Sequence, residues 1–159
     1  MIRVVLTVLV AVALLAASLP ALETARADTT AERLDGEAER VERAVSGVVS
    51  GSVAVADRAL AARTTTTVRA PTGVTAAPIE RLALVDGDES SSAGEGHGVA
   101  LRYRLGDGDD RFVSVVPTTL AANVEVVGEE VPLRTGGESR IELRFVDADS
   151  PTVEIARSG

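Results

Sequence analysis

The residues of this chain whose types could do chemistry are one histidine and several acidic clusters. His97 lies in the run Gly-Glu-Gly-His-Gly at 94–98, and with no cysteine and no second histidine it lacks the partners of a zinc site. Asp-Gly-Asp-Glu at 86–89 and Asp-Gly-Asp-Asp at 107–110 carry oxygen ligands that Ca²⁺ accepts, but neither has the EF-hand spacing. Since Asp-Gly is a common hairpin turn, we expect turns and solvated loops at these places, with no metal and no cofactor.

Patterns for nucleophilic catalysis are absent. The chain has no Gly-x-Ser-x-Gly and no His-Glu-x-x-His, and Ser-x-x-Lys is impossible because there is no lysine. The glycine-rich run at 94–98 does not lead from a strand into a helix, so it does not match a nucleotide-binding fingerprint. Only a carboxylate mechanism would remain, and no spacing selects a pair. We expect no enzymatic activity, no catalytic residues and no small-molecule substrate.

The charge of the chain restricts its partners. There are 24 acidic and 16 basic residues, giving a net charge of −8, and every basic residue is an arginine. This balance argues against nucleic acid or an anionic lipid surface as the main partner. An acidic, lysine-free chain rich in Ala, Val and Arg resembles proteins of extreme halophiles, in which carboxylates keep the surface hydrated at high salt. GC-rich coding with chance acidity is the alternative.

The elements that must position these residues begin with an uncharged run of 19 residues from Val4 to Leu22. At about 1.5 Å per residue it would span roughly 28 Å, close to the apolar thickness of a bilayer. In one interpretation residues 1–27 are a signal peptide, cleaved after Ala27 in the Ala-x-Ala pattern of Ala25-Arg26-Ala27. In the other, which we favour, they stay as a transmembrane anchor. Arg3 on the short side then favours a cytoplasmic N-terminus, with the rest of the chain outside the cell.

The stretch from Leu15 to Glu23, Leu-Ala-Ala-Ser-Leu-Pro-Ala-Leu-Glu, resembles the N-terminal helix of type IV pilins and pseudopilins. The resemblance covers about the first 60 residues. It implies a hydrophobic helix that bends at Pro20 and continues as an amphipathic helix beneath a β-sheet head. The family's prepilin-peptidase site and its Glu near the mature N-terminus are missing, and Arg3 lies near where that Glu should fall. The whole chain also resembles small, uncharacterised haloarchaeal membrane-anchored proteins.

An amphipathic helix is predicted at residues 28–63. Thr29 with Glu32 is a capping-box pattern. Apolar and small residues then recur with a mean spacing of 3.5, which predicts one buried face. Gly47 and Gly51 form a Gly-x-x-x-Gly stripe on this helix; it would pack either on another subunit or, as we favour, under the protein's own sheet. The residues of the predicted buried face are Leu34, Ala38, Val41, Val45, Val48, Ser52, Val55 and Ala59.

Residues 64–159 are predicted to form an antiparallel β domain that packs on this helix. Val99 to Leu105 alternates apolar residues with arginines, and Phe112 to Val116 returns as its hairpin partner. Ile141 to Phe145 and Val153 to Ile155 form a second hairpin, and Val124–Val126 with Val131–Leu133 a weaker pair. The expected fold is α+β: one long helix, part transmembrane and part amphipathic, against an antiparallel sheet of five to seven strands.

These elements predict a structural protein. We expect a membrane-anchored, pilin-like or pseudopilin-like subunit of a pilus or secretion-type system, whose N-terminal helix also contacts other subunits. The alternative is a secreted or surface-tethered binding module, released by cleavage after Ala27.

Overall fold

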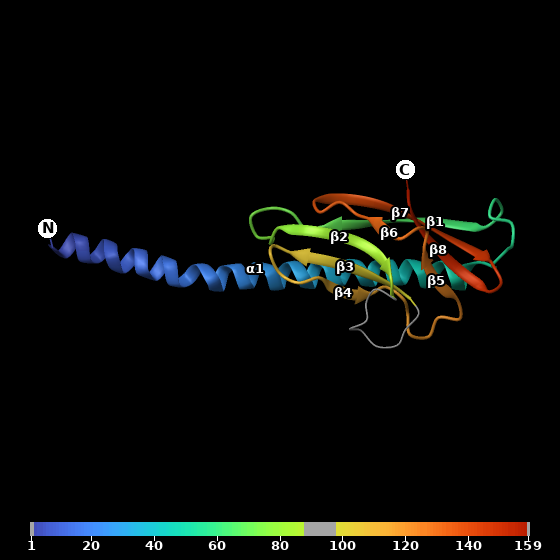
Figure 1. The fold of residues 1–159 in the computed structure, drawn as a ribbon, viewed down its shortest axis with the longest axis horizontal. Coiled ribbons are helices and arrows are strands. Elements are labelled where there is room, and N and C mark those ends of the chain that lie inside the picture. The colour runs from blue at the N-terminus through green and yellow to red at the C-terminus, as the bar shows by residue number, and fades with distance from the viewer. Residues whose placement is uncertain (1, 88–97, 159) are drawn as a thin grey trace.

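The computed structural model describes residues 2–87 and 98–158, which form one long helix and eight strands. Helix α1 (Ile2–Gly51) contains 50 residues and is therefore roughly 75 Å long. Its C-terminal half lies along the strands, and its N-terminal half projects beyond them (Figure 1). The predicted α+β class, with a long N-terminal helix packed on a mainly antiparallel β structure, is confirmed.

The strands form two four-stranded sheets instead of one. The strand orders are β1-β7-β8-β5 and β4-β3-β2-β6. All neighbouring strands are antiparallel except β5 and β8, which are parallel. The strands are β1 (Ala62–Ala70), β2 (Ile79–Asp86), β3 (Val99–Leu105), β4 (Arg111–Ser114), β5 (Asn123–Val126), β6 (Glu130–Pro132), β7 (Gly137–Asp147) and β8 (Pro151–Arg157).

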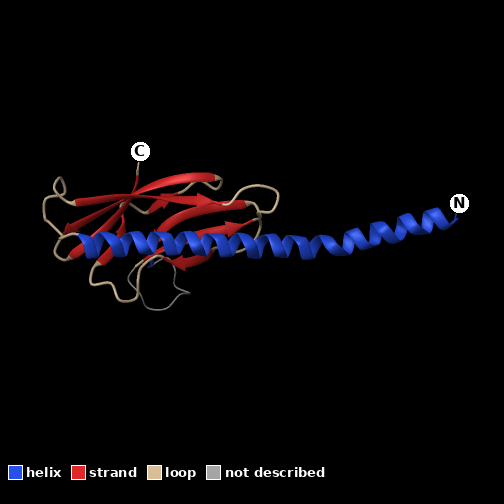
Figure 2. Cartoon of the chain, turned by 180° about the vertical axis from the view of Figure 1, so that it is seen from behind, coloured by secondary structure: helices blue, strands red, loops and turns tan. Residues whose placement is uncertain are grey.

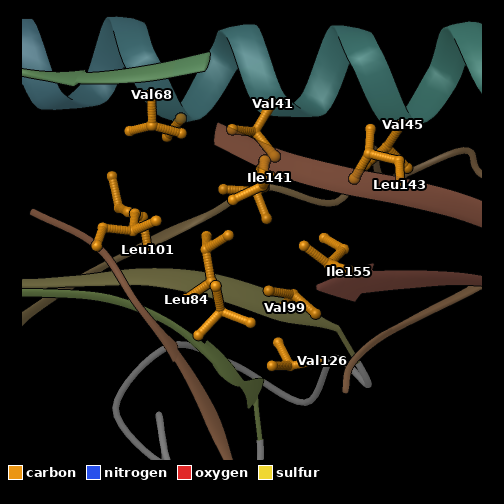
Figure 3. Packing of buried hydrophobic residues seen from close by; sticks show 14 of the residues in the cluster. Val41, Val45, Val68, Leu84, Val99, Leu101, Val126, Ile141, Leu143 and Ile155 are labelled. Atoms are coloured by element: carbon orange, nitrogen blue, oxygen red, sulfur yellow. The ribbon is translucent and has the colours of Figure 1, made fainter. Parts of the chain in front are cut away.

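The helix and both sheets enclose one hydrophobic core. Helix α1 packs against β1 and β7 and touches β4, so it covers one side of the strands (Figure 2). Figure 3 shows Val41 and Val45 of the helix facing Ile141 and Leu143 of β7, with side chains of the second sheet beyond them. The five buried apolar residues of the helix are the first five of the eight predicted for its buried face: Leu34, Ala38, Val41, Val45 and Val48.

The two predicted hairpins are confirmed. In β3, Val99, Leu101 and Tyr103 are buried, while Arg102 and Arg104 alternate with them on the other face. Strand β4 pairs with β3 through the turn at 106–110, and β7 pairs with β8 through the turn at 148–150. The period-two pattern therefore located both strand pairs and their buried faces.

The predicted end of the helix at Arg63 is wrong, because α1 ends at Gly51. Residues 52–61 form a connection in which Val55 bridges Val146 of β7 and the Leu60 N–H donates to the Asp57 carbonyl at 3.0 Å. Val55 therefore contacts the sheet through its backbone and not as part of a helical seam. The four consecutive threonines Thr64 to Thr67 lie in strand β1, as their β-branched side chains favour.

The predicted helix start at Thr29 is also wrong. The helix runs through this position and through Pro20 without a break. The Thr29 hydroxyl donates to the Ala25 carbonyl one turn back, at 2.9 Å, instead of capping an N-terminus. Thr29 and Glu32 have the residue types of a capping box, but the preceding apolar residues already continue the helix, so no free N-terminal N–H groups remain to be capped.

The predicted pairing of Val124–Val126 with Val131–Leu133 is wrong as well. Strand β5 pairs with β8 in one sheet, and β6 pairs with β2 in the other. Gly128, at φ 104°, lies in the connection that carries the chain from one sheet to the other. Leu133 follows β6 and donates its N–H to the Leu82 carbonyl at 2.9 Å. This segment is therefore a link between two sheets.

Candidate functional site

Residues 2–22 of α1 form a mainly apolar helix in which every residue is exposed. The most apolar 18-residue window has a mean hydropathy of 2.5, and none of it is buried. In a soluble domain such a helix would bury an apolar face, since exposed patches of this size mark interaction sites. The exposed large residues are Ile2, Val4, Val5, Leu6, Val8, Leu9, Val10, Val12, Leu14, Leu15, Leu19 and Leu22.

The hydroxyl groups of this segment and of the turn after it bond to the helix itself. The Thr7 hydroxyl donates to the Arg3 carbonyl at 2.9 Å, and the Ser18 hydroxyl donates to the Leu14 carbonyl at 2.8 Å. Thr24 makes the same bond to the carbonyl of Pro20 at 3.0 Å. Hydroxyl groups that are paired within one helix meet the requirement that lipid imposes on the side chains of a spanning segment.

The junction between the exposed helix and the β structure lies between Arg26 and Thr30. Arg26 and Ala27 are half buried, and Thr30 is the first fully buried residue of the helix. The Thr30 hydroxyl donates to the Arg26 carbonyl at 2.8 Å and accepts the N–H of Ala77 at 2.9 Å. Thr30 therefore ties the β1–β2 loop to the helix at the point where packing begins. A contact between residues 47 positions apart has no local sequence signal.

The candidate cation clusters lie in turns or outside the described residues. His97 and residues 88 and 89 belong to the part that is not described. Asp86 uses its carboxylate to accept the Val126 N–H at 2.9 Å, a bond between the two sheets. Among the described residues no group of three His, Asp or Glu side chains could hold a metal ion.

Asp110, at the end of the β3–β4 turn, is paired with arginines of the same sheet. It accepts a hydrogen bond from Arg104 Nε at 2.8 Å and lies 4.0 Å from Arg81. These partners, Arg104 above all, hold the pKa of Asp110 below its usual value, and the carboxylate in turn raises the pKa of Arg104. The arrangement fixes the hairpin and engages the Asp110 carboxylate in ion pairs.

Tyr103 is the only tyrosine, and its side chain is buried under the helix side of β3. Burial raises the pKa of Tyr103, the nearby carboxylate of Asp35 adds to the rise, and Arg111 opposes it. The phenol therefore stays neutral, as a core residue. It is not an activated acid or base.

The glycine stripe of the helix lines an open groove. A methyl group placed on Gly47 or Gly51 would meet no atom within 4 Å. The groove has a volume of about 480 Å³ and lies between the end of α1 and the first half of β1, from Ala62 to Thr66. The stripe therefore faces strand β1 of the protein's own sheet, as expected, but across an open groove and without close packing. Val41, Val45 and Val48, on an adjacent face of the helix, are the residues that pack into the core beneath the sheet.

A second hollow, of about 440 Å³, lies on the outer face of the first sheet. The buried carboxylate of Glu154 pairs with Arg58 Nε at 3.0 Å, and Arg144 pairs with Glu142 at 2.8 Å. The Arg58–Glu154 pair fastens the connection after the helix to strand β8. The sequence did not single out either residue, because they lie 96 positions apart. Both arginines of the hollow are already paired, so the hollow has the character of a structural ion-pair layer.

A family model for a domain of unknown function (DUF7311) matches residues 1–158. The chain belongs to this family. The match includes the exposed apolar helix as well as the β structure, so the anchor-like segment is part of what the family shares. No curated protein and no solved structure matches the chain.

Proposed function

We propose that the chain is a single-pass membrane protein whose N-terminal helix is retained and holds the β head outside the cell. The observation that carries the proposal is the apolar helix: it is fully exposed, long enough to span a bilayer, and continuous with the helix that forms part of the head's core. Arg3 on the short side supports a cytoplasmic N-terminus. The proposed role is structural, with no reaction assigned to the head.

Within that role we favour a pilin-like or pseudopilin-like assembly subunit. The supporting features are the Leu-Ala-Ala-Ser-Leu-Pro-Ala stretch at residues 15–21, and a helix that continues from the apolar part into an amphipathic part beneath β-strands. The missing peptidase site and the missing N-terminal Glu separate this chain from subunits that are processed into a filament. The proposed assembly therefore uses the helix while it remains in the membrane.

Packing between copies can be tested with single cysteines, since the chain has none. Variants with one cysteine at each position from Val10 to Ala17 would be oxidised in native membranes. Subunits that pack through the helix should give cross-linked dimers with a period of 3.6 residues along this series. Equal, weak cross-linking at every position would contradict the assembly proposal and leave the anchor standing.

One observation favours the alternative of a secreted binding module. The buried part of the helix begins at Thr30, so cleavage after Ala27 would leave the packed residues of the head intact. The cut would remove the Arg26 carbonyl, which accepts the Thr30 hydroxyl, but not the bond from Ala77 to Thr30. The cost to the head would be small, because one exchanged hydrogen bond contributes about 1 kcal/mol.

The mature N-terminus decides between the two proposals. Membrane and medium fractions would be separated and the intact mass of the protein measured in each. A full-length chain in the membrane supports the anchor, and a chain that begins at Asp28 in the medium contradicts it. An Ala27→Leu variant serves as the control, because a bulky residue blocks an Ala-x-Ala cleavage site. It should change the distribution only if cleavage normally occurs.

We also propose that the head works in concentrated salt. The excess of 24 acidic over 16 basic residues would repel itself at low ionic strength, and high salt screens that repulsion. The thermal unfolding temperature of the head should rise from about 0.1 M to 2 M KCl. A temperature that is unchanged or lower at high salt would contradict this proposal.

A further inference from the structure

The loop between β1 and β2 is the uncharged tip of the head at the end from which the anchor leaves. Residues 70–79 contain no charged residue, in a chain of which 25% is charged. The loop lies at the same end of the head as the projecting half of helix α1 (Figure 1). Val74, in its middle, has 85% of its surface exposed.

The position of the loop along the helix is fixed. The bond from the Ala77 N–H to the Thr30 hydroxyl holds its second half against α1. Thr30 is eight residues beyond Leu22, so it lies about 12 Å beyond the apolar run. Residues 73–76 form a tight turn, so Val74 lies within about 7 Å of Ala77. Val74 can therefore come to about 5 Å from the end of the apolar run, which is within the lipid headgroup layer that adds about 5–7 Å to each side of the apolar core.

The shape of the loop presents Val74 outwards. The Ala76 N–H donates to the Gly73 carbonyl at 3.1 Å, and Gly73 has a φ of 102°, which favours glycine. The tight turn leaves the Val74 side chain at its tip, where no described residue covers it. The exposed apolar side chain is thus held by one hydrogen bond that closes the turn and by a second, from Ala77 to Thr30, directly after it.

The surrounding charges favour this loop over its neighbour as the point of contact. The β3–β4 turn lies at the same end of the head (Figure 1) and carries Asp107, Asp109 and Asp110, which anionic lipid repels. Arg26, one turn before Thr30, makes no ion pair among the described residues, and its Nε is buried without a hydrogen-bond partner.

We propose that the 71–78 loop is a second membrane contact, with Val74 inserted at the lipid headgroup level and the head tilted towards this loop. The contact is apolar, so it requires a lipid surface and not a particular headgroup. It rests on the proposed function, because an anchored helix is what brings the loop to the membrane.

The chain has no tryptophan, so one introduced residue reports its own depth. Full-length Val74→Trp protein would be reconstituted in phosphatidylcholine vesicles containing lipids brominated near the headgroup end of the acyl chain. Leu60→Trp is the matched control, since Leu60 is 77% exposed and lies in the connection that follows the C-terminal end of the helix. Leu14→Trp reports on the anchor. We expect at least twofold stronger quenching for V74W than for L60W, and strong quenching for L14W.

Each other outcome has a distinct meaning. Quenching of L14W with V74W no more quenched than L60W would overturn the loop contact and leave the anchor in place. Absence of quenching in L14W would overturn the anchor, and the loop contact with it. A blue-shifted V74W emission without lipid quenching would assign the loop to a protein partner and overturn the lipid assignment.

Tryptophan itself prefers membrane interfaces, so a second measurement uses Val74→Cys. The rate of alkylation by a charged maleimide would be compared between protein in vesicles and protein kept soluble by amphipol, without detergent or lipid. We expect the vesicles to slow V74C at least fivefold relative to a Leu60→Cys control. Equal rates for the two variants would contradict the proposal whatever the tryptophan variants show.

Discussion

The carboxylate of Glu37 in helix α1 accepts the backbone N–H of Arg69 in strand β1 at 2.9 Å. Glu37 is almost fully buried, and its two oxygens also accept hydrogen bonds from Arg40 one turn further along the helix. β1 is an edge strand of its sheet, so the Arg69 N–H has no neighbouring strand to bond. One helix side chain thus accepts a hydrogen bond from a backbone N–H at the open edge of the sheet on which the helix packs.

Replacing Glu37 by Ala should destabilise the head by about 1–3 kcal/mol, because the Arg69 N–H would be left without its acceptor. Glu39→Ala is the matched control on the exposed face of the same helix, and it should change the free energy of unfolding by less than about 0.5 kcal/mol. Urea unfolding of the full chain in detergent micelles measures both. Equal effects of the two substitutions would show that the bond to β1 contributes nothing.

Gly47→Ala should stabilise the protein by about 0.5–1 kcal/mol. The position is helical, and an added methyl group meets no atom within 4 Å. Gly128→Ala should instead destabilise it, since φ is 104° there. The midpoint of urea unfolding for each variant provides the measurement. A loss of stability in G47A would mean that another part of the assembly occupies the groove.

Leu14→Arg tests the anchor directly. An arginine at the centre of a spanning helix costs about 3 kcal/mol on insertion scales, so the membrane-bound fraction should fall clearly. Leu60→Arg places the same charge on another exposed leucine, in the connection after the helix, and should leave localisation unchanged. Membrane fractionation of both variants gives the result. Unchanged membrane binding of L14R would show that this helix is not inserted at its centre.

The single tyrosine makes an alkaline titration simple to interpret. Because burial raises the pKa of Tyr103 above 10.0 in the folded chain, the folded state holds its proton at pH values where the unfolded state loses it. Stability from this group is thus complete below pH 10 and is lost as pH rises through the folded pKa. Absorbance at 295 nm should show ionisation above pH 10, together with unfolding. A normal, reversible titration of the folded chain would contradict burial of the phenol.

Asp110 should give a pH dependence of the opposite sense. Its pKa is lower in the folded state, so its contribution is present above the ordinary carboxyl pKa of 3.8 and is lost as pH falls through the lower folded value. The pairing is partly solvated, so Asp110→Asn should cost less than about 1 kcal/mol at neutral pH, and the difference should vanish in acid. Urea unfolding at a series of pH values from 7 to well below 3.8 tests this, with Asp107→Asn, an exposed neighbour, as the control. A cost that does not decrease along the acidic part of this series would assign it to packing.

The sequence predicted those parts of the fold that repeat locally. The 3.5-residue spacing from Leu34 to Val48 identified the helix face that enters the core, and the alternation from Val99 to Leu105 identified a strand with one buried face. Such patterns depend only on neighbours within a few positions. The apolar run from Val4 to Leu22 was recognised in the same way.

The parts that the sequence missed depend on distant partners. Nothing near Val124 shows that β5 joins β8 in parallel, and nothing near Val131 shows that β6 crosses to β2. The helix end was misplaced because residues 52–61 continue a helical spacing, whereas Val55 bonds across to Val146. The contacts of Thr30 and Glu154 join residues 47 and 96 positions apart, respectively. Local patterns carry no information about such pairs.

The unbroken helix of 50 residues has a mechanical consequence. Because the bilayer segment and the head share one continuous helix, a rotation of the bilayer segment about the helix axis rotates the head by the same angle. Inserting one residue between Leu22 and Thr30 would rotate the head by about 100° and raise it by about 1.5 Å, while four residues would leave it about 40° from its original orientation. The number of residues in that short stretch therefore determines which side of the head faces neighbouring molecules.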